Sequence, residues 1–218
     1  MARTRIKICG ITNIEDANHA VAEGTDALGF VFYTASPRNI SIAQASEITR
    51  RIPAFVSLVA LFVDADEVHI RAVLDRVVID MLQFHGDESE EECLRYGLPY
   101  VKAIRVKPGA DLRKIISAYP SAKAVLLDTY HATLPGGTGE KFDWSQIPSD
   151  LKCPIILAGG LNAQNVGQAI AAVSPYAVDV SGGVELAKGK KDPEQISAFF
   201  NAVNFADKKL VKLPQPAN

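Results

Sequence analysis

The chain has 218 residues, of which 48% are hydrophobic and 22% are charged, a balance typical of a folded globular protein. Its net charge of −2 provides no basic field to recruit nucleic acid or an anionic membrane. The most apolar run, residues 56–63, is too short to span a bilayer, and residues 1–5 lack the apolar core of a signal peptide. We therefore expect a cytoplasmic protein that binds neither nucleic acid nor membrane.

Three cysteines, Cys9, Cys93 and Cys153, are scattered along the chain without a CxxC pair. An odd and sparse set is typical of a reducing compartment and argues against a disulfide framework. No His, Cys, Asp or Glu residues show a recognisable metal-ligand spacing. The sequence therefore predicts no metal site.

Short apolar runs alternate with amphipathic segments along almost the whole chain. The runs that we expect to form strands cover residues 6–8, 26–32, 55–63, 79–84, 100–106, 124–127, 154–157 and 177–180. About eight strand–helix units in alternation predict an α/β fold, a single-domain (β/α)8 TIM barrel over residues 1–207, with a frayed tail over 208–218. The alternative is an open doubly wound sheet, which usually has a GxGxxG turn after its first strand; residues 9–13, CGITN, do not match it.

Local signals mark where some of the expected helices begin. Thr12 with Glu15, and Ser41 with Gln44, have the spacing of capping boxes, in which two side chains satisfy the free backbone donors of the first turn. Asn162 is placed to cap the helix after the seventh strand. The first helix is therefore expected to start directly after the first strand.

The connection over residues 129–144, which contains the run PGGTG, is unusually long. Loops of this length inside a compact domain are usually functional or mobile. Because it follows the strand that ends at Asp128, we interpret it as a candidate lid.

Polar side chains stand at or just beyond the carboxyl ends of five expected strands. They are Cys9, Arg38, His85, Asp128 and Asp179. In a barrel these strand ends meet at one mouth. Plain structural roles stay open for each, such as a buried core thiol or a solvated loop arginine, and so does a Cys9–His85 nucleophile pair.

Glycine pairs follow the last two expected strands, where barrels commonly bind phosphate. The residues concerned are Gly159, Gly160, Ser181, Gly182 and Gly183. One such pair alone is typical of a tight turn. Two pairs in consecutive units, with a serine hydroxyl beside one of them, favour a phosphate site because backbone N–H groups can approach an anion there.

Several short motifs fall in order along the chain from the first strand to the last loop. They are residues 7–12 (KICGIT), 36–38 (SPR), 83–86 (QFHG), 127–129 (LDT), 137–139 (GTG) with 142–144 (FDW), 157–162 (LAGGLN) and 179–185 (DVSGGVE). Together they resemble the motifs of the phosphoribosylanthranilate isomerase family. The chain differs from the usual family pattern at Phe84 (usually leucine), at Gly182 (usually serine) and at residues 186–189, where a Pro-Gly pair is common.

The resemblance implies a cofactor-free Amadori rearrangement in tryptophan biosynthesis, acting on a small sugar phosphate, phosphoribosylanthranilate. It also implies that Asp128 is the acid that protonates the ribose ring oxygen and that Cys9 is the base that removes the proton from C2′. Arg38 would pair with the anthranilate carboxylate, and the two glycine loops would hold the phosphate. By the same resemblance, His85 and Asp179 are expected to contact the substrate.

These roles make opposite demands on the two groups. A free thiol is mostly protonated at neutral pH, so Cys9 must be acidified by its surroundings, and Asp128 must be kept protonated. Lys7 lies two residues before Cys9 on the same face of the strand. The sequence does not establish whether it lies close enough to help.

Two other functions stay open. The sugar isomerase of histidine biosynthesis catalyses the same rearrangement and resembles this chain in its phosphate loops, but it characteristically has an aspartate where this chain has Cys9. A barrel that binds a sugar phosphate without converting it belongs to a different class, and the intact acid and base argue against it. The sequence leaves a monomer and a homodimer as alternatives.

Overall fold

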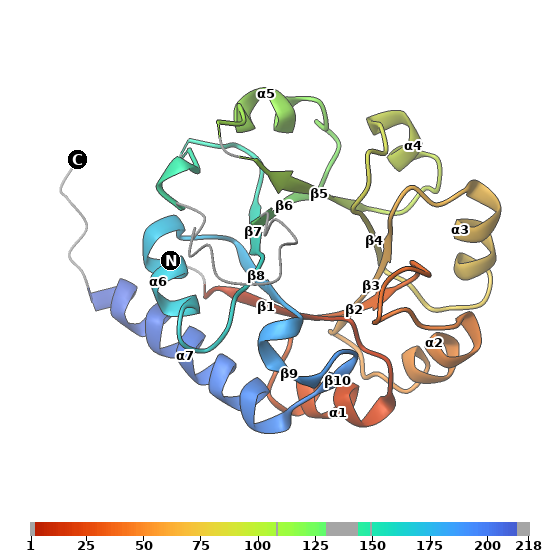
Figure 1. Cartoon of the computed structure of the whole chain (residues 1–218), viewed down its shortest axis with the longest axis horizontal. Coiled ribbons are helices and arrows are strands. Elements are labelled where there is room, and N and C mark those ends of the chain that lie inside the picture. Colours follow the sequence, from red (N-terminus) through yellow and green to blue (C-terminus); the bar gives the residue numbers. More distant parts are fainter. Residues whose placement is uncertain (1–2, 108, 130–143, 149, 213–218) are drawn as a thin grey trace.

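A computed structural model describes residues 3–107, 109–129, 144–148 and 150–212. Parallel strands close into a barrel in chain order, and the helices lie around it (Figure 1). The strands are β1 (Arg5–Cys9), β2 (Ala27–Val31), β3 (Ser57–Phe62), β4 (Met81–Phe84), β5 (Tyr100–Val106), β6 (Ala124–Thr129), β7 (Ile155–Ala158) and β8 (Ala177–Val180). β8 pairs with β1 and closes the barrel. The predicted single-domain (β/α)8 fold is confirmed.

The helices connect successive strands on the outside of the barrel (Figure 1). They are α1 (Ile14–Ala22), α2 (Ile42–Thr49), α3 (Glu67–Leu74), α4 (Glu90–Leu94), α5 (Leu112–Ser117), α6 (Val166–Val173) and α7 (Pro193–Lys212). A 3-10 helix, η1 (Trp144–Gln146), stands between β6 and β7. The candidate lid over 129–144 lies mostly outside the described residues. The last helix extends to Lys212, beyond the expected boundary at residue 207.

The start of α1 differs from the predicted capping box. Asn13, not Thr12, is the N-cap, and its side chain accepts a hydrogen bond from the backbone N–H of Asp16. The Thr12 hydroxyl instead donates to the carbonyl of Gly189. The prediction was therefore one residue out of register, because a contact from the far end of the chain engages the hydroxyl.

The two other predicted caps have different outcomes. The capping box of α2 is present in both directions between Ser41 and Gln44, which confirms that prediction. Asn162 does not cap α6: its side chain accepts from the backbone N–H groups of Gln164 and Asn165 in the turn before the helix, and Asn165 occupies the N-cap position.

The strands bury different side chains on their two faces, as expected for a barrel covered by helices. On β1, Ile6 and Ile8 join the large core between the barrel and the helices, whereas Cys9 joins a small interior cluster with Val31 and Leu61. The alternation of side chains along a strand therefore directs Cys9 into the barrel. The inward-facing residues at the carboxyl ends of the other strands form the mouth together with it.

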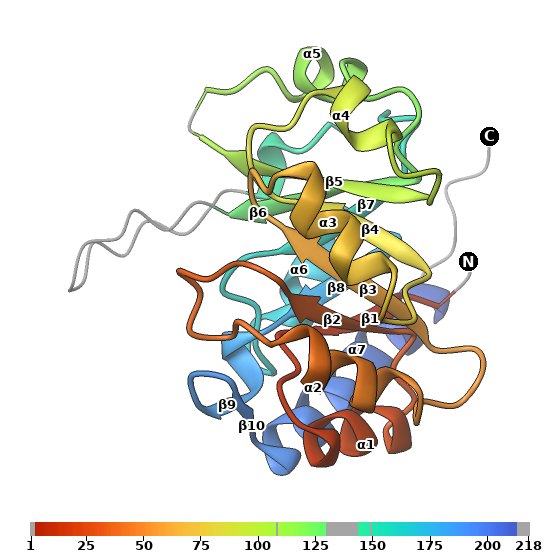
Figure 2. The ribbon, with the colours of Figure 1, turned by 90° about the vertical axis from the view of Figure 1, so that its right-hand side faces the viewer.

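A short antiparallel hairpin follows β8 at this mouth. The chain passes through the 3-10 helix η2 (Gly182–Val184) into β9 (Glu185–Ala187) and returns along β10 (Lys190–Lys191). Seen from the side, the hairpin of β9 and β10 lies at the end of the barrel toward which the strand arrows point (Figure 2). It gives the loop after Glu185 a defined shape that the sequence left open. Within the described part of the chain, no helix has the length and apolar character needed to cross a membrane.

Candidate active site

A cavity of about 770 Å³ opens at the carboxyl ends of the barrel strands, within the size range of small-molecule sites. Every site residue expected from the sequence lines it: Cys9, Arg38, His85, Asp128, Gly159, Gly160, Asp179, Ser181, Gly182 and Gly183. The barrel therefore brings together residues that are far apart in the sequence, as the positions at strand ends predicted. Their lining of one cavity does not by itself assign their roles.

Cys9 is the last residue of β1, and only 6% of it is exposed. Burial raises the pKa of its thiol above the ordinary value, because a thiolate is poorly solvated in the barrel interior. The positive charges of Lys7 and Lys191 oppose this effect, and the Asp179 carboxylate adds to it. The pKa of the Cys9 thiol therefore depends on the charged groups around it as well as on burial.

Lys7 and Asp179 form a buried ion pair across the neighbouring strands β1 and β8. The two residues are in register, and Lys7 Nζ donates to both carboxylate oxygens at 3.0 Å. Their side chains are 7% and 8% exposed. Burial is the strongest single influence and would lower the pKa of Lys7, but the Asp179 carboxylate and Cys9 together outweigh it and raise that pKa. Lys7 therefore carries its positive charge inside the barrel.

His85 and Asp128 meet on another wall of the cavity. His85 Nε2 lies 3.1 Å from Asp128 Oδ2, and Gln83 Nε2 lies 3.3 Å from His85 Nδ1. An amide nitrogen can only donate, so with this orientation of Gln83 the imidazole accepts at Nδ1 and carries its proton on Nε2, facing Asp128. The Asp128 side chain is 32% exposed, which leaves it accessible from the cavity.

Arg38 is held by Glu185, which Lys191 contacts in turn, and the sequence assigned no role to either Glu185 or Lys191. Arg38 Nε and Nη2 donate to the two Glu185 oxygens, each at 2.7 Å, and Lys191 Nζ donates to Glu185 Oε1 at 2.9 Å. Burial works against the charge of Glu185, but these bonds outweigh it and lower the pKa of Glu185. Lys191 also donates to the carbonyl oxygens of Cys9 and Ser181, so one buried ammonium joins the ends of β1 and β8.

Lys191 was missed because the run 188–191, KGKK, reads as a solvated charged turn. The only available signal was its position: Lys191 pairs with Glu185 across the hairpin of β9 and β10. That pairing depends on the hairpin, which short-range patterns did not predict.

The two glycine loops approach each other closely beside Arg38. A Cβ at Gly183 would lie 1.8 Å from the carbonyl oxygen of Leu161, so only glycine fits at this position. A Cβ at Gly182 would lie 3.3 Å from Arg38 Nη2. The absence of side chains thus brings backbone groups of both loops to the cavity, as an anion site requires.

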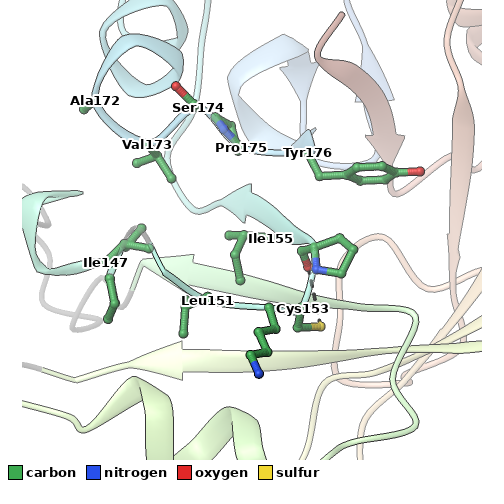
Figure 3. A pocket seen from close by; sticks show the side chains of 12 residues that line it. Ile147, Leu151, Cys153, Ile155, Ala172, Val173, Ser174, Pro175 and Tyr176 are labelled. Carbon is green, nitrogen blue, oxygen red and sulfur yellow. Dashed lines mark hydrogen bonds between the residues drawn. The ribbon is translucent and has the colours of Figure 1, made fainter. Parts of the chain in front are cut away.

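A second cavity of about 360 Å³ lies at the amino ends of β7 and β8. Figure 3 shows its lining, which includes Cys153, Ile155 and Tyr176. The Cys153 sulfur is half-buried near the carbonyl oxygens of Ala122 and Pro154. None of the expected site residues lines this cavity. Among the described residues, no group of three or more His, Cys, Asp or Glu is arranged to hold a metal ion.

Comparisons with known proteins agree on one family. Residues 6–202 match the family described as N-(5'phosphoribosyl)anthranilate (PRA) isomerase. The chain is 56% identical over 206 residues to the N-(5'-phosphoribosyl)anthranilate isomerase of Pseudomonas putida (strain GB-1), covering 94% of this chain and 100% of that relative. It is 57% identical over 203 residues to the same enzyme of Pseudomonas fluorescens (strain Pf0-1), covering 93% and 100%.

Solved structures agree with the sequence comparisons. The crystal structure of phosphoribosyl anthranilate isomerase from Thermotoga maritima superposes with a TM-score of 0.85 at 41% identity, covering 93% of this chain and 99% of that chain. A phosphoribosyl anthranilate isomerase in complex with reduced 1-(o-carboxyphenylamino)-1-deoxyribulose 5-phosphate has a TM-score of 0.82 at 39% identity, with the same coverage. These matches confirm the resemblance seen in the motifs. The chain therefore belongs to the N-(5'-phosphoribosyl)anthranilate isomerase family and is an isomerase of tryptophan biosynthesis.

Proposed function

We propose that this chain converts N-(5'-phosphoribosyl)anthranilate to 1-(2-carboxyphenylamino)-1-deoxyribulose 5-phosphate without a cofactor, with Cys9 as general base and Asp128 as general acid. The observation that carries the proposal is that a thiol at the end of β1 and a carboxylate in β6 line one cavity. An acid and a base on separate walls can act on two different atoms of one bound sugar.

The reaction needs one proton delivered and one removed. Asp128 protonates the ribose ring oxygen, and the ring opens to an imine. The Cys9 thiolate then takes the proton from C2′, which gives an enolamine that tautomerises to the ketone. The overall change is an isomerisation, so no electrons are exchanged with an outside partner.

Arg38 binds the anthranilate carboxylate in this proposal. A guanidinium has five N–H donors arranged along more than one edge, and Glu185 engages the edge formed by Nε and Nη2. The edge that includes Nη1 suits a second carboxylate. Glu185 would thus hold Arg38 in place for the substrate rather than compete with it for the same donors.

The phosphate binds to the two glycine loops, with Ser181 adding a hydroxyl, and His85 and Asp179 contact the sugar. A relative in this family is described in complex with a reduced form of the product, which supports a sugar phosphate as the ligand class. His85, whose Nε2 lies 3.1 Å from Asp128 Oδ2, is also placed to orient the acid.

A turnover assay tests the proposal. The purified chain is expected to convert phosphoribosylanthranilate, and Asp128→Asn is expected to lower kcat by roughly 10²-fold or more, the range of general acid catalysis, with an unchanged circular dichroism spectrum. Calorimetric binding of the substrate without any conversion by the parental protein would contradict the proposal and favour a barrel that only binds sugar phosphates.

The cellular location and the oligomeric state are also part of the proposal. We expect it to work in the cytoplasm as a monomer or a homodimer. A structure from the same family describes monomers generated from the dimeric enzyme of Thermotoga maritima. Light scattering of the purified chain distinguishes the two states, and an assembly larger than a dimer would contradict this expectation.

A further inference from the structure

Lys7, Cys9 and Asp179 meet below the cavity, next to Gly29 of β2. Gly29 is in register with Cys9 on the adjacent strand. A Cβ at Gly29 would lie 2.9 Å from Cys9 Sγ and 3.1 Å from Lys7 Nζ. Both side-chain ends therefore lie beside the space that this glycine leaves, and the ammonium and the thiol are close neighbours.

We propose that Lys7, held by Asp179, is a positioning residue that favours the proton-accepting thiolate form of Cys9 against the effect of burial, and that Gly29 provides the room in which the two side chains meet. This inference rests on the proposed function, because it takes Cys9 to be the base. It adds a reason why a buried thiol can act as one.

The charged side chains that act on Cys9 include Lys7 from β1, Asp179 from β8, Lys191 from β10 and Arg38 from the loop after β2. Burial opposes the thiolate most strongly, and Lys7 is the strongest of the groups that oppose burial. Of these charges, removal of Lys7 should therefore change the pKa of the Cys9 thiol most.

Asp179 has a double effect in this cluster. It keeps Lys7 charged in a place where a lone ammonium would be poorly solvated, and it raises the pKa of the thiol directly through its own negative charge. As long as Lys7 stays protonated, loss of the Asp179 charge should therefore lower the pKa of the thiol, whereas loss of Lys7 should raise it. A purely structural role for the ion pair would produce no such opposition.

The chain offers a matched control for the burial of this pair. Lys102 and Glu88 form another buried ion pair, with side chains 3% and 7% exposed, and Lys102 stands on β5 with its side chain among the outward-facing residues. Lys102 contacts Glu88, the carbonyl oxygen of Gly86 and the Tyr119 ring on that side of the strand. Lys102→Met removes a buried ammonium from a barrel strand without removing a charge from beside the thiol.

The experiment follows alkylation of Cys9 by iodoacetamide from about pH 7 to pH 11, by peptide mass spectrometry, a range that extends well above the ordinary thiol pKa because burial raises that of Cys9. The thiolate is the reacting form, so the midpoint of the rate profile reports the pKa of Cys9. Cys153, in the second cavity, is the internal reference thiol. The variants are Lys7→Met, Lys7→Arg, Asp179→Asn and Lys102→Met.

We expect Lys7→Met to move the Cys9 midpoint upward by about one pH unit or more, the size expected for loss of a nearby opposite charge. Lys7→Arg keeps the charge and should retain most of the parental midpoint, whereas Asp179→Asn should lower it. Lys102→Met should leave it in place, and the Cys153 midpoint should stay constant throughout. An unchanged Cys9 midpoint in Lys7→Met would overturn the proposal, whereas an upward shift in Asp179→Asn would show that Lys7 loses its charge without the carboxylate that holds it.

Two further points keep the test decisive. If Lys7→Met does not fold, Asp179→Asn and Gly29→Ala still test the cluster, because Gly29→Ala must displace the thiol or the ammonium and so change the midpoint. If Cys9→Ala retains the parental turnover, the base assignment itself fails. If Cys9→Ala is inactive while the midpoint of Lys7→Met is unchanged, the base assignment stands and the role of Lys7 is refuted.

Discussion

Two buried lysine–carboxylate pairs occupy opposite faces of the barrel wall. Lys7 pairs with Asp179 inside the barrel, and Lys102 pairs with Glu88 outside it, beneath the helices. The two pairs are similar in burial but differ in surroundings. Lys7 has a thiol beside it, whereas Lys102 donates to the carbonyl oxygen of Gly86 and faces the Tyr119 ring.

The outer pair holds two loops of the cavity face together. Glu88 accepts hydrogen bonds from the backbone N–H groups of Asp64 and Gly86, at 2.8 Å and 2.9 Å, which joins the loops after β3 and β4. Gly86 directly follows His85. The same kind of buried charge pair thus joins loops on the outer face of the barrel wall and lies beside a thiol on the inner face.

The largest expected effect is a difference in kcat between two cysteine variants, one at Cys9 inside the barrel and one at Cys153 in the second cavity. Cys9→Ala should lower kcat by on the order of 10²- to 10⁴-fold, the contribution typical of general acid–base catalysis. Cys153→Ala, in the second cavity, should leave kcat unchanged. Steady-state assays of both variants check this, and equal activities would remove the distinction between the two ends of the barrel.

The outer pair should matter most for stability. Glu88→Leu leaves Lys102 buried without its carboxylate and two backbone N–H groups without their acceptor, and we expect a loss of about 3–5 kcal/mol in the free energy of unfolding. Urea denaturation measures it. A loss below about 1 kcal/mol, the level of an exposed pair, would show that this pair does not hold the loops.

Arg38 and its support should affect substrate binding more than the chemical step. Arg38→Ala should raise KM by roughly 10- to 100-fold, corresponding to about 1.5–3 kcal/mol for hydrogen bonds to a charged group. Glu185→Gln should raise KM by less, since the guanidinium stays present but is held less firmly. A fall in kcat with unchanged KM in both variants would contradict a role in carboxylate binding.

The smallest effect concerns the helix that follows Cys9. Asn13→Ala removes the N-cap of α1 and should cost about 1 kcal/mol of stability, measured by urea denaturation. It should not change the alkylation midpoint of Cys9, because it removes no charge near the thiol. A shifted midpoint would mean that the pKa of Cys9 changes when the helix is destabilised, so a shift in Lys7→Met could no longer be assigned to the lost charge.

The barrel was predictable because alternating strands and helices are encoded in short apolar runs, and the site residues were predictable because parallel strands end at one mouth. The sequence did not show that Lys7 faces the barrel interior while Lys102 faces the helices. Each is a single lysine within an apolar strand, and only closure of the barrel decides which side chains of a strand face inward. Lys191 depends on the β9–β10 hairpin, and the N-cap of α1 depends on Gly189, so both required contacts between distant parts of the chain.

The most direct test is the pH dependence of kcat/KM in the parental protein, Lys7→Met and Lys102→Met. If the Cys9 thiolate is the base, as proposed, activity should rise with pH until Cys9 is ionised, and removal of the Lys7 charge should move that rise to higher pH. We predict an upward shift of about one pH unit or more for Lys7→Met, with activity recovering at alkaline pH, and the parental rise for Lys102→Met. A rise at the same pH in all three proteins would contradict the account.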